Sequence, residues 1–205
     1  AAVAHKHNIP FIVDNTFATP INCRPFEWGA DIVTHSTTKY MDGHATQVGG
    51  RVVDSGNFDW MAHADKYPGL CTSDESYHGL TYAKDFGKKG YITKIVAQLM
   101  RDFGSTPAPQ NSFLLNLGLE TLAVRMERHC SNAQRVAEYL SADPRVAWVR
   151  YSGLPGDSSH ALAIKYMPGG SCGVIAFGLK GSRETAIKFM DSLKMINIAT
   201  HVADL

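Results

Sequence analysis

The first 53 residues contain three short apolar runs, each bounded by small or polar residues. Residues 9–14, 30–36 and 46–53 have the length and the content of branched apolar side chains that are typical of buried β-strands. Between the first two runs, Pro20–Trp28 predicts a short irregular or helical crossover that is closed by Gly29. Strands that alternate with short crossovers predict a parallel sheet whose two faces are covered.

The next fifty residues combine an aromatic-rich stretch with a helical pattern. Because large aromatic side chains favour burial, residues 54–79 predict an ordered excursion with short helices. Its side chains expected to be buried are Phe58, Trp60, Tyr67, Leu70 and Tyr77. Residues 82–103 have the composition of a helix. Helical spacing predicts one inward face for it, formed by Ile92, Ile95, Val96 and Leu99.

A second long helix is predicted over residues 111–140, with a bend at Gly118. Its apolar side chains recur at helical spacing, at Leu115, Leu119, Leu122 and Met126. The charged run 125–129 is predicted to form a solvated or interdomain face of this helix. The remaining pattern predicts a compact α+β unit with a strand over 145–151, a helix over 158–167, a strand over 173–179 and a helix over 183–193.

Composition narrows the classes of protein that fit this pattern. The 205 residues suit one large domain or two small ones. A formal net charge of +1 argues against a dedicated role in binding nucleic acid or a membrane surface. The 4 cysteines include no CxxC pair and the 9 histidines no HExxH spacing, so we expect neither a disulfide framework nor a metal site. A reducing cytoplasm is the simplest location.

Both ends of the sequence lack the signals that normally begin or end a helix. Residues 1–8 have the composition of the end of a helix, without an N-cap or a first turn. Residues 198–205 stop without a terminal turn or helix. We therefore expect a fragment of a longer chain, or a chain whose flanks exist outside these residues.

Polar side chains stand at the ends of the first two predicted strands. Asp14 ends the first strand, and Ser36, Thr38 and Lys39 lie just past the second. In open α/β sheets ligands bind at the carboxyl ends of the strands. An acid, two hydroxyls and an amine suit a cofactor with a basic ring nitrogen, a phosphate and an aldehyde, and pyridoxal phosphate is that cofactor.

Each of these residues also has an ordinary structural interpretation. Asp14 could cap a loop, Ser36 and Thr38 could serve a turn, and a lone lysine is usually a surface charge. The context of Lys39 favours chemistry instead, because an apolar strand and hydroxyl side chains precede it. An amine that is held in a partly dry site acts readily as a nucleophile and a proton carrier.

Two segments carry the motifs of a known family. They are residues 13–20, with the sequence VDNTFATP, and residues 30–40, with ADIVTHSTTKY, followed by Gly43 and His44. Together they closely resemble the Cys/Met-metabolism family of pyridoxal phosphate enzymes, the cystathionine γ-synthase group of fold type I. The resemblance runs over essentially the whole chain, which is similar to the central and later part of a protein roughly twice as long.

Other segments narrow the resemblance to the O-acetylhomoserine sulfhydrylase branch. They are residues 58–80, 116–122 and 125–129. Residues 200–204, THVAD, depart from the ANVGD of that branch at a segment that borders the substrate site in the family. A cystathionine γ-synthase or γ-lyase of the same family is the alternative, and an inactive truncated piece that serves only as a structural domain is another.

The resemblance implies an α/β fold of type I, like that of aspartate aminotransferase. Residues 1–110 would form part of the cofactor-binding large domain with its parallel-type sheet. Residues 111–142 would form a long connecting helix, and residues 143–205 part of the smaller C-terminal α+β domain. A tetramer built from dimers is expected for the full-length protein.

The same resemblance implies roles for individual residues. Lys39 would be the Schiff-base lysine, and Asp14 would pair with the pyridine nitrogen of pyridoxal 5'-phosphate. Ser36 and Thr38 would bind the phosphate, and Thr16 would support the ring near its phenolic oxygen. The family's phosphate-binding Gly loop, its ring-stacking tyrosine, the Tyr/Arg pair from a neighbouring subunit and the arginine that grips the substrate carboxylate have no counterpart in this sequence.

The activity implied is a γ-replacement on O-acetyl-L-homoserine. Sulfide or a thiol would take the place of the acetate group, giving homocysteine or methionine. The partners expected are therefore small molecules and further copies of the chain, without nucleic acid or membrane.

Overall fold

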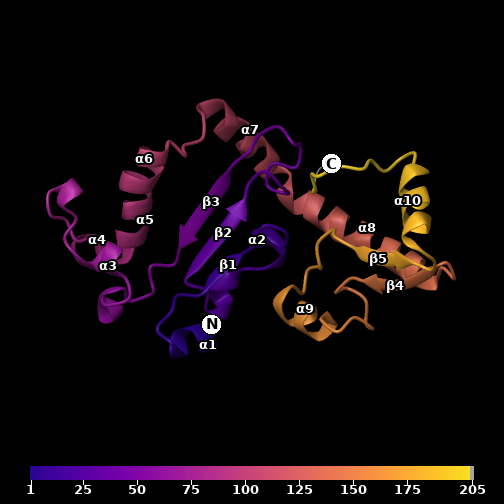
Figure 1. Cartoon of the computed structure of the whole chain (residues 1–205), viewed down its shortest axis with the longest axis horizontal. Coiled ribbons are helices and arrows are strands. Elements are labelled where there is room, and N and C mark those ends of the chain that lie inside the picture. Colours follow the sequence, from indigo (N-terminus) through magenta and orange to yellow (C-terminus); the bar gives the residue numbers. More distant parts are fainter. Residues whose placement is uncertain (204–205) are drawn as a thin grey trace. The chain divides into compact units, whose positions relative to one another are not determined.

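The computed structural model describes residues 1–203 and divides into two compact units that interleave along the sequence. The first unit contains residues 1–15, 24–36 and 49–113 (Figure 1). The second unit contains residues 16–23 and 37–48 and the chain from Leu114 onward. The chain therefore passes between the units several times.

The first unit is built on a three-stranded sheet in the order β1-β2-β3. β1 (Ile12–Asp14) pairs in parallel with β2 (Ile32–Ser36), and the two predicted strands are confirmed. β3 (Gly50–Asp54) pairs with β2 in the antiparallel direction, so the prediction of a wholly parallel sheet is wrong for this strand. The reason is the link over residues 37–49, which contains no helix that could carry the chain back along β2.

This unit contains an aromatic core and several short helices. The buried members of the core are Ile32, Trp60, Leu70, Tyr82 and Ala83. The other predicted aromatics, Phe58, Tyr67 and Tyr77, are partly buried against it, which confirms the ordered excursion. The helices are α1 (Ala2–Lys6), α3 (Pro68–Cys71), α4 (Tyr82–Phe86), α5 (Gly90–Lys94) and α6 (Arg101–Phe103), with 3-10 turns over Pro25–Trp28, Met61–His63, Glu75–Tyr77 and Gly87–Lys89.

The predicted inward face of the 82–103 helix is wrong in its second half. Val96 is 54% exposed and Leu99 is 42% exposed. Residues Ile95–Met100 form a π-helical turn, which changes the angle between successive side chains. The contact with the core lies earlier, in α5, where the ring of Tyr91 stacks on Trp60 at 5.3 Å between centroids.

In the second unit, a break divides the predicted long helix into two helices. α7 (Pro109–Glu120) enters this unit from the first and ends before Thr121, and α8 (Leu122–Ala142) continues beyond it. The bend therefore lies at Thr121, whose φ of −104° and ψ of 0° depart from helical values, and not at Gly118. Leu119, expected on the apolar face, is 41% exposed.

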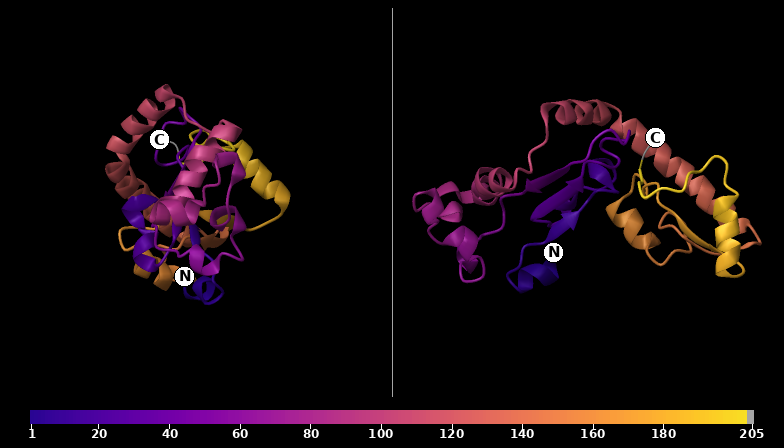
Figure 2. Two further views of the ribbon diagram at one scale, coloured as in Figure 1. Left: turned by 90° about the vertical axis from the view of Figure 1, so that its left-hand side faces the viewer. Right: turned by 45° about the horizontal axis from the view of Figure 1, so that its top comes forward.

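The rest of the second unit confirms the predicted order of strand, helix, strand and helix. β4 (Val146–Arg150) pairs with β5 (Ala176–Leu179) in the antiparallel direction, and β4 packs beside α8 (Figure 2). The other helices are α2 (Thr19–Asn22), α9 (His160–Tyr166) and α10 (Arg183–Asp191).

Two small apolar clusters lie along α8 in this unit. One contains Tyr40, Met41, Leu115, Leu122, Met126 and Cys130, and the other contains Ala133, Ala137 and Tyr151. In the part of the chain that the structure describes, no helix combines the length and the apolar character needed to cross a membrane.

Candidate functional site

The carboxyl edge of β1 and β2, in the first unit, presents two of the predicted residues on one face of the sheet. Asp14 is the last residue of β1 and lies opposite Thr34 of β2. Ser36 follows Thr34 by two positions and therefore projects from the same face as Asp14. Val33 and His35 project from the other face, where both are buried, whereas Asp14 is exposed and Ser36 is half-buried.

His35 is a buried histidine directly before Ser36. Burial lowers the pKa of its imidazole, although the Asp14 carboxylate and a hydrogen bond with the backbone of Asn15 partly oppose this shift. Its Nδ1 has no hydrogen-bond partner among the described residues. The lowered pKa keeps the ring neutral near pH 7, so it does not form an ion pair with Asp14.

Lys39 lies in the second unit, in the segment Thr37–Gln47, which we call the lysine loop. The loop begins directly after Ser36, and the Lys39 side chain is half-buried. Backbone hydrogen bonds close the turn around it: the Asp42 N–H donates to the Thr37 carbonyl at 3.1 Å, and the Gly43 N–H donates to the Lys39 carbonyl at 2.9 Å. The backbone at Lys39 is therefore held on both sides.

The remainder of the lysine loop is fixed by buried polar side chains. The Gln47 amide donates to the Thr37 carbonyl at 3.1 Å. Asp42 is fully buried, and its carboxylate accepts hydrogen bonds from the Thr46 N–H and hydroxyl, both at 2.8 Å. These bonds fold the loop into a compact turn.

Arg125 of α8 binds this loop from the helix side. Its Nη1 donates to the Tyr40 carbonyl at 2.7 Å, and its Nη2 donates to the Gly118 carbonyl at 2.7 Å. Its Nε donates to the Thr121 hydroxyl at 3.0 Å. Arg125 is only 7% exposed, so the solvated alternative predicted for this face is wrong at this residue. Gly118 is the sequence feature that could have predicted this buried contact, because a glycine inside a helix often marks a place where another part of the chain comes close.

Tyr40, the residue after Lys39, is anchored by its ring and its hydroxyl. The ring meets Phe17 and His129 edge to face, at 6.1 and 5.1 Å between centroids. Its hydroxyl accepts a hydrogen bond from the Gly173 N–H at 3.1 Å. Burial raises the pKa of Tyr40 to about 12, so the phenol stays protonated near neutral pH. Tyr40 therefore anchors the loop through its ring contacts and its hydrogen bond.

The five predicted site residues are divided between the two units, but they lie close together in the sequence. Asp14 and Ser36 belong to the first unit, and Thr16, Thr38 and Lys39 belong to the second. Thr16 is buried two positions after Asp14, and Thr38 is half-buried two positions after Ser36. Together their side chains provide a carboxylate, three hydroxyls and a primary amine. These groups suit the ring nitrogen, the phosphate and the aldehyde of pyridoxal phosphate.

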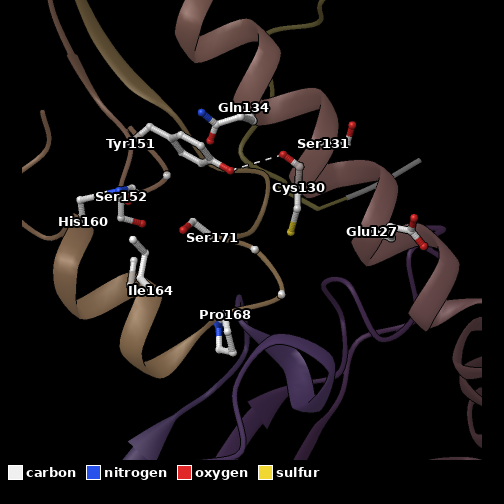
Figure 3. Close-up of a pocket in the computed structure, with 14 residues that line it drawn as sticks. Glu127, Cys130, Ser131, Gln134, Tyr151, Ser152, His160, Ile164, Pro168 and Ser171 are labelled. Atoms are coloured by element: carbon white, nitrogen blue, oxygen red, sulfur yellow. Dashed lines mark hydrogen bonds between the residues drawn. The ribbon is translucent and has the colours of Figure 1, made fainter. Parts of the chain in front are cut away.

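A separate pocket of about 370 Å³ lies in the second unit, beside α8 and α9 (Figure 3). Its lining includes Cys130, Tyr151, His160 and Ser171. The Tyr151 hydroxyl is within reach of the Cys130 carbonyl at 3.5 Å and of the Cys172 carbonyl at 3.1 Å. None of the five predicted site residues lines this pocket.

Comparison with known families decides what this arrangement belongs to. A model of the Cys/Met metabolism PLP-dependent enzyme family matches residues 1–205. The chain belongs to this family. The predicted family is thus confirmed over the full sequence, and with it the expectation of an enzyme class that uses pyridoxal phosphate.

Similar proteins in this family carry related names. A homocysteine/cysteine synthase of Kluyveromyces lactis is 44% identical over 99% of this chain and 48% of its own length. An O-acetyl-L-homoserine sulfhydrylase of Thermus thermophilus is 40% identical over 100% of this chain and 48% of its own length. The chain therefore spans about half the length of the curated relatives it matches.

A solved structure confirms the fold class. The crystal structure of an O-acetylhomoserine (thiol)-lyase of Campylobacter jejuni superimposes with a TM-score of 0.92, at 36% identity, over 99% of this chain and 49% of that chain. That protein carries an N'-pyridoxyl-lysine-5'-monophosphate. The mixed sheet with its helices is thus an α/β fold of type I, as predicted. The segment 200–204, where the sequence departs from its branch, ends at Asp204, which lies outside the described residues.

Proposed function

We propose that the protein containing this chain is a pyridoxal 5'-phosphate-dependent transferase that replaces the acetate group of O-acetyl-L-homoserine with sulfide or a thiol. The products are homocysteine or methionine, and acetate. One observation carries the proposal: Lys39 follows directly on the strand edge where Asp14 and Ser36 share one face. The family membership and the names of the similar proteins support it.

Five residues of this chain are assigned to the cofactor. The amine of Lys39 would condense with the aldehyde with loss of water, and the carboxylate of Asp14 would hold the proton on the ring nitrogen. The hydroxyls of Ser36 and Thr38 donate hydrogen bonds to the phosphate, and Thr16 supports the ring. When bound, pyridoxal phosphate supplies an electron sink for the carbanions that this reaction requires.

Lys39 has a second role once the substrate amine has displaced it. Its Nζ removes the proton from the α-carbon of the amino acid and returns a proton to the reacting centre. The turn hydrogen bonds of Thr37 and Gly43 hold its backbone in place for both tasks. Asp14 acts throughout, because each carbanion depends on a protonated ring nitrogen.

Several properties of the whole protein follow from the same proposal. Residues 1–110 belong to the cofactor-binding domain, residues 111–142 form its connection, and residues 143–205 belong to the C-terminal domain. The full-length protein is a homotetramer built from dimers, acts in methionine biosynthesis and is located in the cytoplasm. Its partners are small molecules and its own copies.

A substrate comparison tests the proposed reaction. The full-length protein is supplied with O-acetylhomoserine and sulfide, with O-acetylhomoserine and cysteine, or with methionine alone, and O-succinylhomoserine replaces the acetyl ester in parallel. We expect acetate and homocysteine to appear fastest with the acetyl ester and sulfide. Faster formation of cystathionine from cysteine, or of ammonia from methionine, contradicts the proposal.

A further inference from the structure

The Arg125 side chain joins three segments of the second unit at one point. Its guanidinium donates to the Tyr40 carbonyl in the lysine loop and to the Gly118 carbonyl in α7, both at 2.7 Å. Its Nε donates to the Thr121 hydroxyl at the break between α7 and α8, at 3.0 Å. A planar guanidinium fixes several acceptor directions at once, which an ammonium group cannot do.

Two glycines provide the space for this contact. A Cβ at Gly43 would lie 2.5 Å from Nη1 of Arg125, and a Cβ at Gly118 would lie 2.4 Å from the Asp42 carbonyl oxygen. Neither distance is compatible with a larger residue unless the neighbouring atoms move. The lysine loop therefore lies close to the Arg125 side chain of α8 and to the backbone of α7.

Arg125 carries its positive charge in a buried position. Burial lowers the pKa of the guanidinium, and the carboxylate of Asp42 opposes this shift. Both residues are below 10% exposed, at 7% and 0%. An apolar side chain of similar volume often stabilises such a site as well or better, because it avoids the desolvation of a charge. A buried guanidinium is thus better explained by the geometry that it imposes than by stability.

We propose that Arg125 is a positioning residue for Lys39. It holds the peptide group of Tyr40, immediately after Lys39, while the Gly43 N–H holds the carbonyl of Lys39 itself. The Asp42 N–H holds the Thr37 carbonyl before Lys39, so the backbone that carries the Lys39 side chain is held on both sides. This inference rests on the proposed role of Lys39 as the amine that bonds the cofactor.

The test compares four variants of the full-length protein. Arg125→Met removes the charge and the hydrogen bonds. Arg125→Lys keeps the charge but loses the planar fork that bonds several acceptors at once. Thr121→Val removes one acceptor at the exposed helix break. Arg128→Met is the matched control, because Arg128 is an exposed arginine one turn further along α8. Two measurements are made: hydrogen exchange of the lysine loop in cofactor-free protein, and the rate of attachment of pyridoxal phosphate to Lys39, trapped with borohydride.

We expect loop exchange to become faster in the order Thr121→Val, Arg125→Lys, Arg125→Met, with Arg128→Met like the wild type. At saturating cofactor, the rate constant of attachment falls by about 10- to 100-fold in Arg125→Met, as is usual when a reacting group is misplaced by about 1 Å. A merely structural role would instead lower the fraction of protein that reacts and leave the rate constant of that fraction unchanged.

The outcomes separate this inference from the proposed function. Wild-type exchange and attachment rates in Arg125→Lys and Thr121→Val overturn the positioning role, even if Arg125→Met does not fold. If the wild type attaches no cofactor at Lys39, the proposed function fails, and the exchange measurement still decides whether Arg125 holds the loop.

Discussion

Asp14 and His35 show how one strand edge separates a charged side chain from a neutral one. Asp14 is exposed, whereas His35 on the opposite face of the sheet is buried, and burial lowers the pKa of its imidazole. A neutral imidazole does not compete for the Asp14 carboxylate as an ion-pair partner. A carboxylate is the group needed to hold a proton on a pyridine nitrogen.

Replacing Asp14 with Asn removes this charge with little change in shape. We expect kcat/KM of the full-length enzyme to fall by about 100-fold or more, or about 3 kcal/mol, which is the scale for losing a preorganised electrostatic contact. Asp14→Glu should lose less, because the charge is kept. Steady-state kinetics at saturating cofactor provide the measurement, and the exposed Asp65→Asn is the control. Wild-type kinetics in Asp14→Asn contradict the assigned role.

His35 predicts a dependence of stability on pH. Its pKa is lowered from 6.5 in the folded state, so below about pH 6.5 the unfolded chain binds more protons than the folded one. The free energy of unfolding should therefore be largest above this pH and decrease as the pH falls below it. In His35→Gln this part of the decrease should be lost, and in the exposed His7→Gln it should remain. Urea unfolding at a series of pH values measures both slopes.

At the scale of elements, Gly118 of α7 is a position inside a helix where only a glycine fits without movement of its neighbours. Gly→Ala inside a helix normally stabilises a protein by about 0.5–1 kcal/mol. Here the new Cβ would meet the carbonyl oxygens of Asp42 and Met41 at 2.4 and 2.6 Å. Gly118→Ala should therefore destabilise the protein by about 1–3 kcal/mol, as overpacking does. Denaturant unfolding measures this, with the exposed Asn116→Ala as control, and a stabilised Gly118→Ala protein is the contrary result.

The elements that local periodicity determines could be predicted from the sequence. Both strands that meet at the candidate site, and the order of elements after residue 145, follow from spacing within each segment. The direction of β3 could not be predicted, because it depends on the route of the link after Ser36. The π-helical turn at Ile95–Met100 and the break at Thr121 could not be predicted either, since no residue type marks them.

The residue types of the candidate site could be proposed from the sequence, but the contacts that hold these residues in place could not. The strand ends pointed to Asp14 and Lys39, but only the pairing register places Asp14 and Ser36 on one face. Arg125 lies in a charged run that resembles a solvated surface, and its acceptor on Tyr40 is 85 residues away in the sequence. Contacts of this range leave no periodic signal.

At the scale of the whole molecule, cofactor binding should contribute to folding stability. A ligand that binds only the folded state at 100 times its Kd adds about 2.7 kcal/mol. Thermal unfolding of the full-length protein should therefore shift upward when pyridoxal phosphate is added, and by less in Lys39→Ala. Pyridoxine phosphate, which lacks the aldehyde, is the matched control ligand. Equal shifts in the wild type and in Lys39→Ala are the result that argues against a bond to this lysine.

The most direct measurement is the position of the covalently trapped cofactor. The full-length protein is incubated with pyridoxal phosphate, reduced with borohydride, digested and mapped by mass spectrometry, alongside Lys39→Ala. We predict one phosphopyridoxyl group on the peptide that contains Lys39, and none on the corresponding peptide of Lys39→Ala. Stoichiometric labelling of another lysine, or no labelling of the wild type, would contradict the assignment of Lys39.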